Sequence, residues 1–297
     1  MDIGVKFIKY SLDIKKLKMI DLMKFFPESS TRPARKEVFM PDFSELDNSP
    51  LVGFLFYPRT DSTPCPPGAF DFFVPVEKGV IVSCRFFVGD QSWPWILYFH
   101  GNGEVASDYD GIAPFYHRQE INLVVADFRG YGSSGGSPNF TNLVQDASPI
   151  LEAVKKEIQQ KGFQPDLWVM GRSMGSISAL EIADRHPDQI KGLVVESGFA
   201  SVTRLIKHLA LPSRGIDLEP IEKERMSRIR KISTPALIIH GALDNLVPLQ
   251  EAKDLYALLG TAQKKLVIIP DADHNNIMFA GLDLYLAAIQ NFIEATR

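Results

Sequence analysis

Several residue types and patterns that mark specialised proteins are scarce in this chain of 297 residues. Cysteine occurs only at Cys65 and Cys84, which is too few for a disulfide framework. We expect free thiols in a reducing compartment, and a single bridge between the two stays an open alternative. No run of 18 uncharged apolar residues occurs, so a membrane-spanning helix is not expected.

Neither sign of charge is in excess. The 36 acidic and 32 basic residues give a formal charge of −4, which argues against a surface that binds nucleic acid. The six histidines are scattered, and no H-x-x-x-H or C-x-x-C pair occurs, so neither a metal nor another cofactor is expected. Lysines interrupt the N-terminal apolar residues, so no secretion signal is expected and a cytoplasmic protein is the default.

The N-terminal residues 1–50 are interpreted as an extension of the domain that follows. Residues 8–26 mix apolar and basic side chains, which is typical of an amphipathic helix packed on its own domain. Weak contact with a membrane surface is the second interpretation of this pattern. The remaining residues, 51–297, are expected to form one domain.

Two types of pattern divide that domain. Residues 51–57, 70–75 and 80–88 predict antiparallel strands at the N-terminal edge of a sheet. Six short, nearly unbroken apolar runs then predict strands buried on both faces, at residues 95–99, 123–126, 167–170, 193–195, 236–239 and 266–269. Helical patterns occur between or after most of them, at residues 140–158, 176–185, 249–259 and 282–295. This alternation predicts an α/β fold with a mostly parallel sheet flanked by helices.

One segment is longer than a simple connection between strands requires. Residues 199–233 are interpreted as a short helical cap inserted into the domain. Basic side chains alternate there with an apolar set that is expected to cover an apolar pocket: Phe199, Leu205, Ile206, Leu209, Leu211 and Ile216.

In such sheets, functional residues lie at the carboxyl ends of the strands. Residues 171–175 (GRSMG) match G-x-S-x-G, in which a strand turns sharply into a helix and exposes a serine hydroxyl. Ser173 is therefore the candidate nucleophile. Residues 132–136 (GSSGG) match the pattern too, but no helix starts directly after Ser134, so a flexible turn is favoured there.

A serine nucleophile needs a general base that a third group orients. Asp244 and His274 follow two later strands, in the order Ser, Asp, His. Each residue alone would be unremarkable in a loop, but together they complete a set. Glu196, at the end of an intervening strand, is an alternative acid and is favoured as a structural carboxylate.

These motifs resemble those of the serine-hydrolase branch of the α/β-hydrolase superfamily, over roughly residues 51–297. The resemblance rests on residues 100–103 (HGNG), 127–135 (DFRGYGSSG), 171–175, 241–248 and 273–275 (DHN). It is greatest to small esterases and thioesterases, including protein depalmitoylases, whose cysteine-rich N-terminus is absent here.

The resemblance implies an α/β-hydrolase fold and an oxyanion hole. The backbone N–H groups of Met174 and Asn102 would form that hole and stabilise a developing alkoxide. His100 is favoured as a structural histidine of the same loop.

The predicted function is hydrolysis of a carboxylic ester or thioester of a small or acylated substrate through an acyl-enzyme. Peptidase or acyltransferase activity on the same residues is the nearest alternative. A dinucleotide-binding oxidoreductase is another, because residues 130–135 match G-x-G-x-x-G and Glu152 follows at a suitable distance. Against it, Ser137 and Pro138 are interpreted as an N-cap and a first helical residue, so the helix is expected to start beyond the glycines. A non-catalytic binding protein of the same fold is the last alternative.

Overall fold

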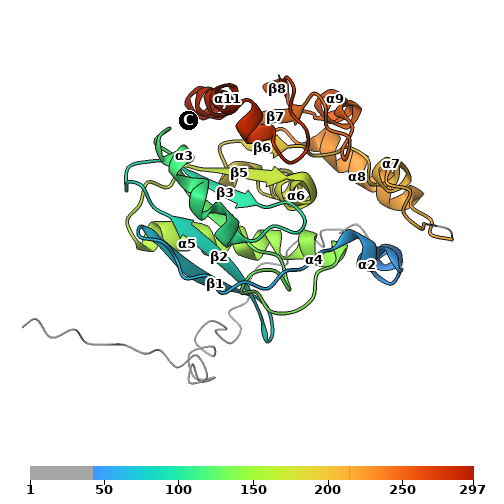
Figure 1. Cartoon of the computed structure of the whole chain (residues 1–297), viewed down its shortest axis with the longest axis horizontal. Helices are drawn as coiled ribbons and strands as arrows, with labels where there is room; N and C mark the ends of the chain where they lie inside the picture. Colours follow the sequence, from blue (N-terminus) through green and yellow to red (C-terminus); the bar gives the residue numbers. More distant parts are fainter. Residues whose placement is uncertain (1–42, 214) are drawn as a thin grey trace, which may run out of the picture. The chain divides into compact units, whose positions relative to one another are not determined.

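One eight-stranded sheet runs through the residues that the computed structural model describes, 43–213 and 215–297 (Figure 1). The strands lie in the order β1-β2-β4-β3-β5-β6-β7-β8. Their bounds are β1 (Ala69–Glu77), β2 (Val80–Phe87), β3 (Trp95–Phe99), β4 (Asn122–Ala126), β5 (Leu167–Arg172), β6 (Leu193–Glu196), β7 (Ala236–Gly241) and β8 (Lys264–Ile269). The pairs β1–β2 and β2–β4 are antiparallel and the other pairs are parallel, which confirms the predicted class.

Helices connect the strands and cover the sheet. The α-helices are α1 (Ser44–Asp47), α2 (Leu51–Leu55), α3 (Ala113–His117), α4 (Phe140–Gln145), α5 (Ala147–Gln160), α6 (Ser176–Arg185), α7 (Val202–His208), α8 (Glu219–Lys231), α9 (Leu249–Leu258), α10 (Ile277–Ala280) and α11 (Leu282–Thr296). The 3-10 helices are η3 (Ala106–Gly111), η4 (Ser173–Gly175) and η5 (Pro187–Gln189).

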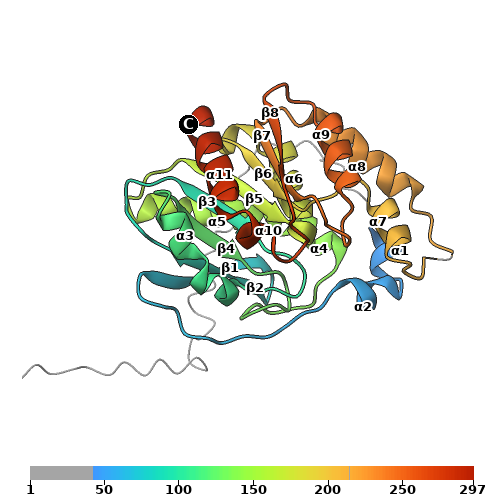
Figure 2. The same cartoon turned by 45° about the horizontal axis from the view of Figure 1, so that its top comes forward.

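The apolar runs form the central strands because both of their faces are covered. Every residue of β3, β4, β5, β6 and β7 is buried. On one face, alternate strand residues such as Ile96 and Tyr98 join a cluster with side chains of α3 and α11, including Tyr116 and Tyr285. Helix α6 packs on β3, β5 and β6 from the other face. Figure 2 shows the sheet from its β1 edge to its β8 edge.

The strand predicted over residues 51–57 is wrong, because this segment contains helix α2. The backbone N–H of Leu51 donates to Ser49 Oγ at 3.2 Å, and Pro50 already has helical dihedral angles. Proline is compatible with the start of a helix because the first N–H groups need no partner within it. A short apolar run does not by itself distinguish a strand from a buried helix.

The helix predicted over residues 140–158 is divided into α4 and α5. Pro149 lies in the first turn of α5 and has no N–H to donate to the carbonyl of Gln145, so the hydrogen-bond ladder is interrupted there. The N-cap of α4 is Asn139, whose side chain accepts from the N–H of Asn142, and not the predicted Ser137. The helix still starts well beyond the glycines of residues 130–135.

Residues 43–50 pack against the rest of the described chain. The ring of Phe43 stacks on Phe140, and the carboxylate of Asp47 accepts from the backbone N–H of Phe140 at 2.7 Å. The domain boundary predicted at residue 50 stays a prediction. The predicted amphipathic segment 8–26 lies outside the described residues.

Two expectations from the sequence, free thiols and no membrane-spanning helix, concern residues that the structure describes. Cys65, half-buried, and Cys84, buried, are both free. Within residues 43–213 and 215–297, no helix is long and apolar enough to cross a membrane.

Candidate active site

The chain turns sharply at Ser173, between the end of β5 and the start of α6. Ser173 has a φ of 51°, in the left-handed region that side chains rarely adopt. A Cβ on Gly171 would lie 2.4 Å from the carbonyl oxygen of Gly175, and a Cβ on Gly175 would lie 2.1 Å from that of Phe99. Both positions therefore require glycine. This is the strand–turn–helix context expected of a nucleophile in a G-x-S-x-G pattern.

Ser173, His274 and Asp244 lie in one hydrogen-bonded chain. His274 Nε2 is 3.1 Å from Ser173 Oγ, and His274 Nδ1 is 2.7 Å from Asp244 Oδ2. A carboxylate only accepts, so Nδ1 carries the proton and Nε2 is left to accept from the serine hydroxyl. The structure brings the three predicted residues together, and their catalytic roles stay a prediction.

The loop after β7 holds Asp244 in its ionised form. Asp244 Oδ1 accepts from the backbone N–H groups of Leu246 at 3.0 Å and Val247 at 2.8 Å. Burial acts to raise the pKa of Asp244, but the hydrogen bonds from His274 and Val247 outweigh it, so this pKa is below its ordinary value. An ionised Asp244 can orient His274 and stabilise its imidazolium form.

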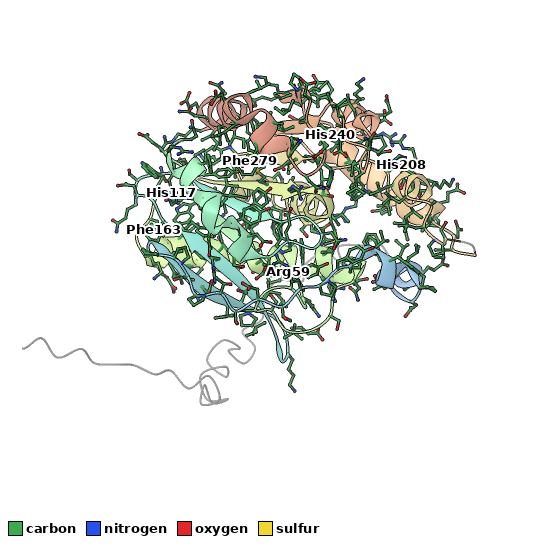
Figure 3. The ribbon with its side chains drawn as sticks, viewed as in Figure 1. Arg59, His117, Phe163, His208, His240 and Phe279 are labelled. Carbon is green, nitrogen blue, oxygen red and sulfur yellow. The ribbon has the colours of Figure 1, made fainter. Side chains whose placement is uncertain are left out.

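Two further histidines, both labelled in Figure 3, contact the same loop. His240, buried on β7, donates from Nε2 to the carbonyl of Val247 at 2.8 Å. His208, at the end of α7, donates to the carbonyl of Asn245 at 2.8 Å. Burial lowers the pKa of His240, so its ring is neutral, and Nδ1 then has no proton to donate. These contacts fix the path of the loop directly after Asp244.

The two predicted oxyanion-hole residues border the same cavity as Ser173 and His274. Met174 is the second residue of η4, where helical N–H groups have no intrahelical partner. The side chain of Asn102 is held by three hydrogen bonds: Oδ1 accepts from Tyr57 N and Tyr131 Oη, and Nδ2 donates to Leu55 O. These bonds fix Asn102 at the cavity that Ser173 also borders, and the oxyanion role stays a prediction.

The alternative serine and the alternative acid lie in other hydrogen-bonded arrangements. Ser134 Oγ accepts from the backbone N–H of Ser83 at 2.8 Å, in the turn after β4. Glu196 accepts from Tyr98, Tyr285 and Arg172. These partners do not include the His274 ring, and the contacts of Glu196 fit the structural carboxylate favoured from sequence.

The glycine-rich loop after β4 and the neighbouring His100 are packed internally. A Cβ on Gly132 would lie 2.1 Å from Asp127 Oδ2, so this carboxylate occupies the space above the glycine. His100, fully buried, donates from Nδ1 to the carbonyl of Gly101 at 2.7 Å, and its Nε2 is 3.4 Å from Asp127 Oδ1. A carboxylate in this position repels a phosphate, which argues against dinucleotide binding by the loop.

A cavity of about 530 Å³ opens beside Ser173 and His274, within the range typical of ligand sites. Helices α2 and α7 lie at the same end of the sheet in both views, and both contribute to its wall (Figures 1 and 2). The apolar lining residues are Phe54, Leu55, Tyr57, Phe140, Met174, Ile177, Phe199, Val202, Leu205, Ile206, Leu209, Leu211, Leu246 and Val247.

Five of the six cap residues predicted to cover a pocket are in this list. The exception is Ile216, which borders a different groove together with Lys207 and Lys223. Ile216 lies in the connection between α7 and α8, and the helical periodicity of α7 does not extend to it. The prediction for Ile216 is therefore wrong.

Comparison with known proteins identifies the superfamily. Protein bem46 of Schizosaccharomyces pombe is 31% identical to this chain over 209 residues, which cover 68% of each protein. The uncharacterized protein YfhR of Salmonella typhi is 29% identical over 216 residues, or 67% of this chain and 70% of that protein. The family Hydrolase_4, described as serine aminopeptidase S33, matches residues 92–215. The chain belongs to the α/β-hydrolase superfamily.

A solved structure supports the fold of this α/β hydrolase. The Pyrococcus furiosus esterase Pf2001 superposes with a TM-score of 0.66 at 19% identity, over 80% of this chain and 98% of that one. This identity is low enough that the likeness concerns the fold alone. Among the described residues of the hydrolase, no group of three His, Cys, Asp or Glu side chains is arranged to hold a metal ion.

Two charged residues of the hydrolase site were not predicted from sequence. Arg172 precedes Ser173 and contacts Glu104, Glu196 and the backbone of His274. Arg172 occupies a variable position of G-x-S-x-G, and Glu104 directly follows the HGNG segment. The available signal was the position of each charge: Arg172 ends β5, and Glu104 lies in the loop after β3.

Proposed function

We propose that this protein is a serine hydrolase that cleaves a carboxylic ester or thioester. The observation that carries the proposal is the hydrogen-bonded chain from Ser173 Oγ through His274 to Asp244, on a serine held at a φ of 51°. A hydroxyl, a base and an orienting carboxylate in this order are the requirements for nucleophilic catalysis by serine.

The contacts support a two-step reaction. Ser173 Oγ attacks the carbonyl carbon while His274 Nε2 takes the hydroxyl proton, and Asp244 stabilises the imidazolium. When the carbonyl double bond re-forms, the bond to the leaving oxygen or sulfur breaks and His274 gives that atom its proton. Water, activated by the same base, then cleaves the acyl-enzyme and returns Ser173. The backbone N–H groups of Met174 and Asn102 are the proposed donors to the oxyanion, worth about 3 to 4 kcal/mol each.

The cavity favours substrates with an apolar acyl group. Its lining is mostly aliphatic and aromatic, and its polar groups gather near Ser173. Burial of each methylene there contributes about 0.8 kcal/mol. We therefore infer a substrate with a medium or long acyl chain in the cavity and a leaving group that is exposed to solvent.

The family description as a serine aminopeptidase favours one second candidate, peptide hydrolysis on the same triad. An apolar cavity can hold a side chain as well as an acyl chain. In this reaction His274 would protonate an amine leaving group instead of an alcohol or thiol.

A substrate panel separates these functions. Purified protein is assayed with p-nitrophenyl esters of increasing chain length, with acyl thioesters and with aminoacyl p-nitroanilides. We expect ester or thioester turnover that rises with chain length and is absent in Ser173→Ala. Turnover of the anilides alone would favour the peptidase, and turnover that survives in Ser173→Ala would contradict the nucleophile.

A further inference from the structure

One buried guanidinium connects three separate parts of the proposed active site. Arg172 is the residue before the nucleophile, and its Nη2 donates to the carbonyl oxygen of His274 at 2.7 Å. Its Nη1 pairs with Glu104, which directly follows residues 100–103, called here the oxyanion loop because they include Asn102. Its Nε donates to Glu196 Oε1 at 3.1 Å. The side chain of Arg172 is only 10% exposed.

Both carboxylates are fixed by further partners. Glu104 Oε2 accepts from the backbone N–H of Gly101 at 2.8 Å and from Tyr109 Oη at 2.9 Å. Through Glu104, Arg172 is therefore connected to the residue directly before Asn102, the proposed oxyanion donor.

Glu196 is held from the other side of Arg172. Its Oε2 accepts from Tyr98 Oη at 2.9 Å and from Tyr285 Oη at 2.7 Å. Burial acts to lower the pKa of Arg172, but the carboxylates Glu104 and Glu196 outweigh it and raise this pKa, so the guanidinium stays charged.

Within the charged cluster (Glu104, Arg172 and Glu196), the guanidinium lies close against the backbone of Gly101. A Cβ on Gly101 would lie 2.4 Å from Arg172 Nη1. Gly101 is therefore needed for the guanidinium to lie directly against the oxyanion loop. A lysine at position 172 has one ammonium centre and cannot reproduce the planar fork that contacts three partners in different directions.

We propose that Arg172 is a positioning residue that sets the distance between the His274 ring and Ser173 Oγ while holding the oxyanion loop in register. The inference rests on the proposed function. Arg172 contacts the backbone of the proposed base, so its removal lets the loop of His274 shift. A displacement of about 1 Å at such a site costs on the order of 100-fold in rate.

Arg228 offers a matched control within the same chain. It is also buried, 11% exposed, and also pairs with two carboxylates, Glu181 and Asp184. These contacts join α8 to α6 and involve none of the residues around Ser173. A general loss of buried ion pairs therefore affects Arg172→Lys and Arg228→Lys alike, whereas loss of positioning affects only the first.

The experiment compares wild type, Arg172→Lys, Glu104→Gln and Arg228→Lys. Measured are kcat and KM for the best ester, the rate constant of labelling by a fluorophosphonate, and the thermal midpoint. We expect Arg172→Lys to lower kcat and the labelling rate about 10- to 100-fold, with KM changed less than about threefold. Glu104→Gln keeps the shape of the side chain and should give a smaller loss of the same kind. Arg228→Lys should keep wild-type kcat.

Three outcomes overturn the inference. These are wild-type kcat in both Arg172→Lys and Glu104→Gln, equal losses in Arg172→Lys and Arg228→Lys, and losses that appear only in KM. If Arg172→Lys does not fold, Glu104→Gln alone is decisive. A lowered kcat in this variant supports the inference, and a wild-type kcat overturns it. A wild-type protein that neither turns over esters nor reacts with the fluorophosphonate refutes the proposed function itself, which is a different observation.

Discussion

The charged cluster and the apolar cavity wall border the same serine but are built differently. Glu104, Arg172 and Glu196 lie at or next to the ends of sheet strands, and the structure connects their charged groups to one another and to neighbouring tyrosines. The wall formed by α2 and α7 consists of apolar side chains on short helices outside the sheet, and Phe54 is half-exposed. Hydrogen bonds in the first region are directional and constrain the positions of its atoms, whereas the apolar contacts in the second are non-directional. We infer that the reaction depends on the sheet ends and the substrate preference on the added helices.

The largest effect on kcat is expected at Asp244, which contacts the proposed base His274. Asp244→Asn should lower kcat about 10⁴-fold, because an amide stabilises the wrong tautomer of His274 and cannot stabilise the imidazolium. Glu196→Gln should lower it by less than about 100-fold, since Glu196 acts only through Arg172. Steady-state kinetics of the two folded variants check this ranking. A larger loss in Glu196→Gln would move the acid to β6 and contradict the proposed triad.

A moderate effect that depends on the substrate is expected in the cavity wall. Leu209→Ala or Ile206→Ala should shift the preferred acyl chain length, because one methylene of pocket contact is worth about 1 to 3 kcal/mol, or roughly tenfold to a few hundredfold. Ile216→Ala is the control, since Ile216 belongs to the cap but does not border the cavity. The check is kcat/KM across the ester panel. Identical chain-length profiles in all four proteins would show that acyl chains bind elsewhere.

Helix α2 allows a sharper test of the same comparison. Phe54, 50% exposed, borders the cavity, whereas Phe279, 59% exposed on α10, does not. Phe54→Ala should lower kcat/KM for long-chain esters by about tenfold and leave short-chain esters unchanged. Phe279→Ala removes an exposed ring of similar size and should change neither. Equal effects of both substitutions would mean that α2 has no specific part in substrate binding.

The smallest effect concerns stability at mildly acidic pH. Burial lowers the pKa of His240 from its ordinary value of 6.5, so the unfolded chain binds a proton that the folded protein excludes. The stability contributed by neutral His240 is present above pH 6.5 and is lost as the pH falls below it. The thermal midpoint of wild type should therefore fall more between pH 7.5 and pH 5.5 than that of His240→Asn. Parallel curves for the two proteins would contradict a buried, neutral His240.

The central strands were predictable because each is a continuous apolar run between polar loops. Residues 95–99 are predicted and observed as a strand without any change of bounds. The segment 51–57 was not predictable in this way, because a short apolar run fits either a buried strand or a helix. Its helical form depends on Ser49, Pro50 and packing on residues distant in sequence.

The candidate site was predictable to the extent that chemistry fixes residue type and order. Ser173, Asp244 and His274 could be selected because only a few strand ends carry suitable side chains. The contacts of Arg172 could not be predicted, because its partners Glu104, Glu196 and His274 are 68, 24 and 102 residues away in the sequence. No local pattern encodes such contacts, and they depend on how parallel strands are ordered in the sheet.

The most direct test of the proposed function is the site of covalent labelling. Wild type, Ser173→Ala, Ser134→Ala and His274→Ala are treated with a fluorophosphonate, and the modified peptide is located by mass spectrometry. The account predicts one label, on Ser173, in wild type and in Ser134→Ala. It predicts no label in Ser173→Ala, and strongly slowed labelling in folded His274→Ala because the hydroxyl then has no base. A label on Ser134, or undiminished labelling without Ser173, would contradict it.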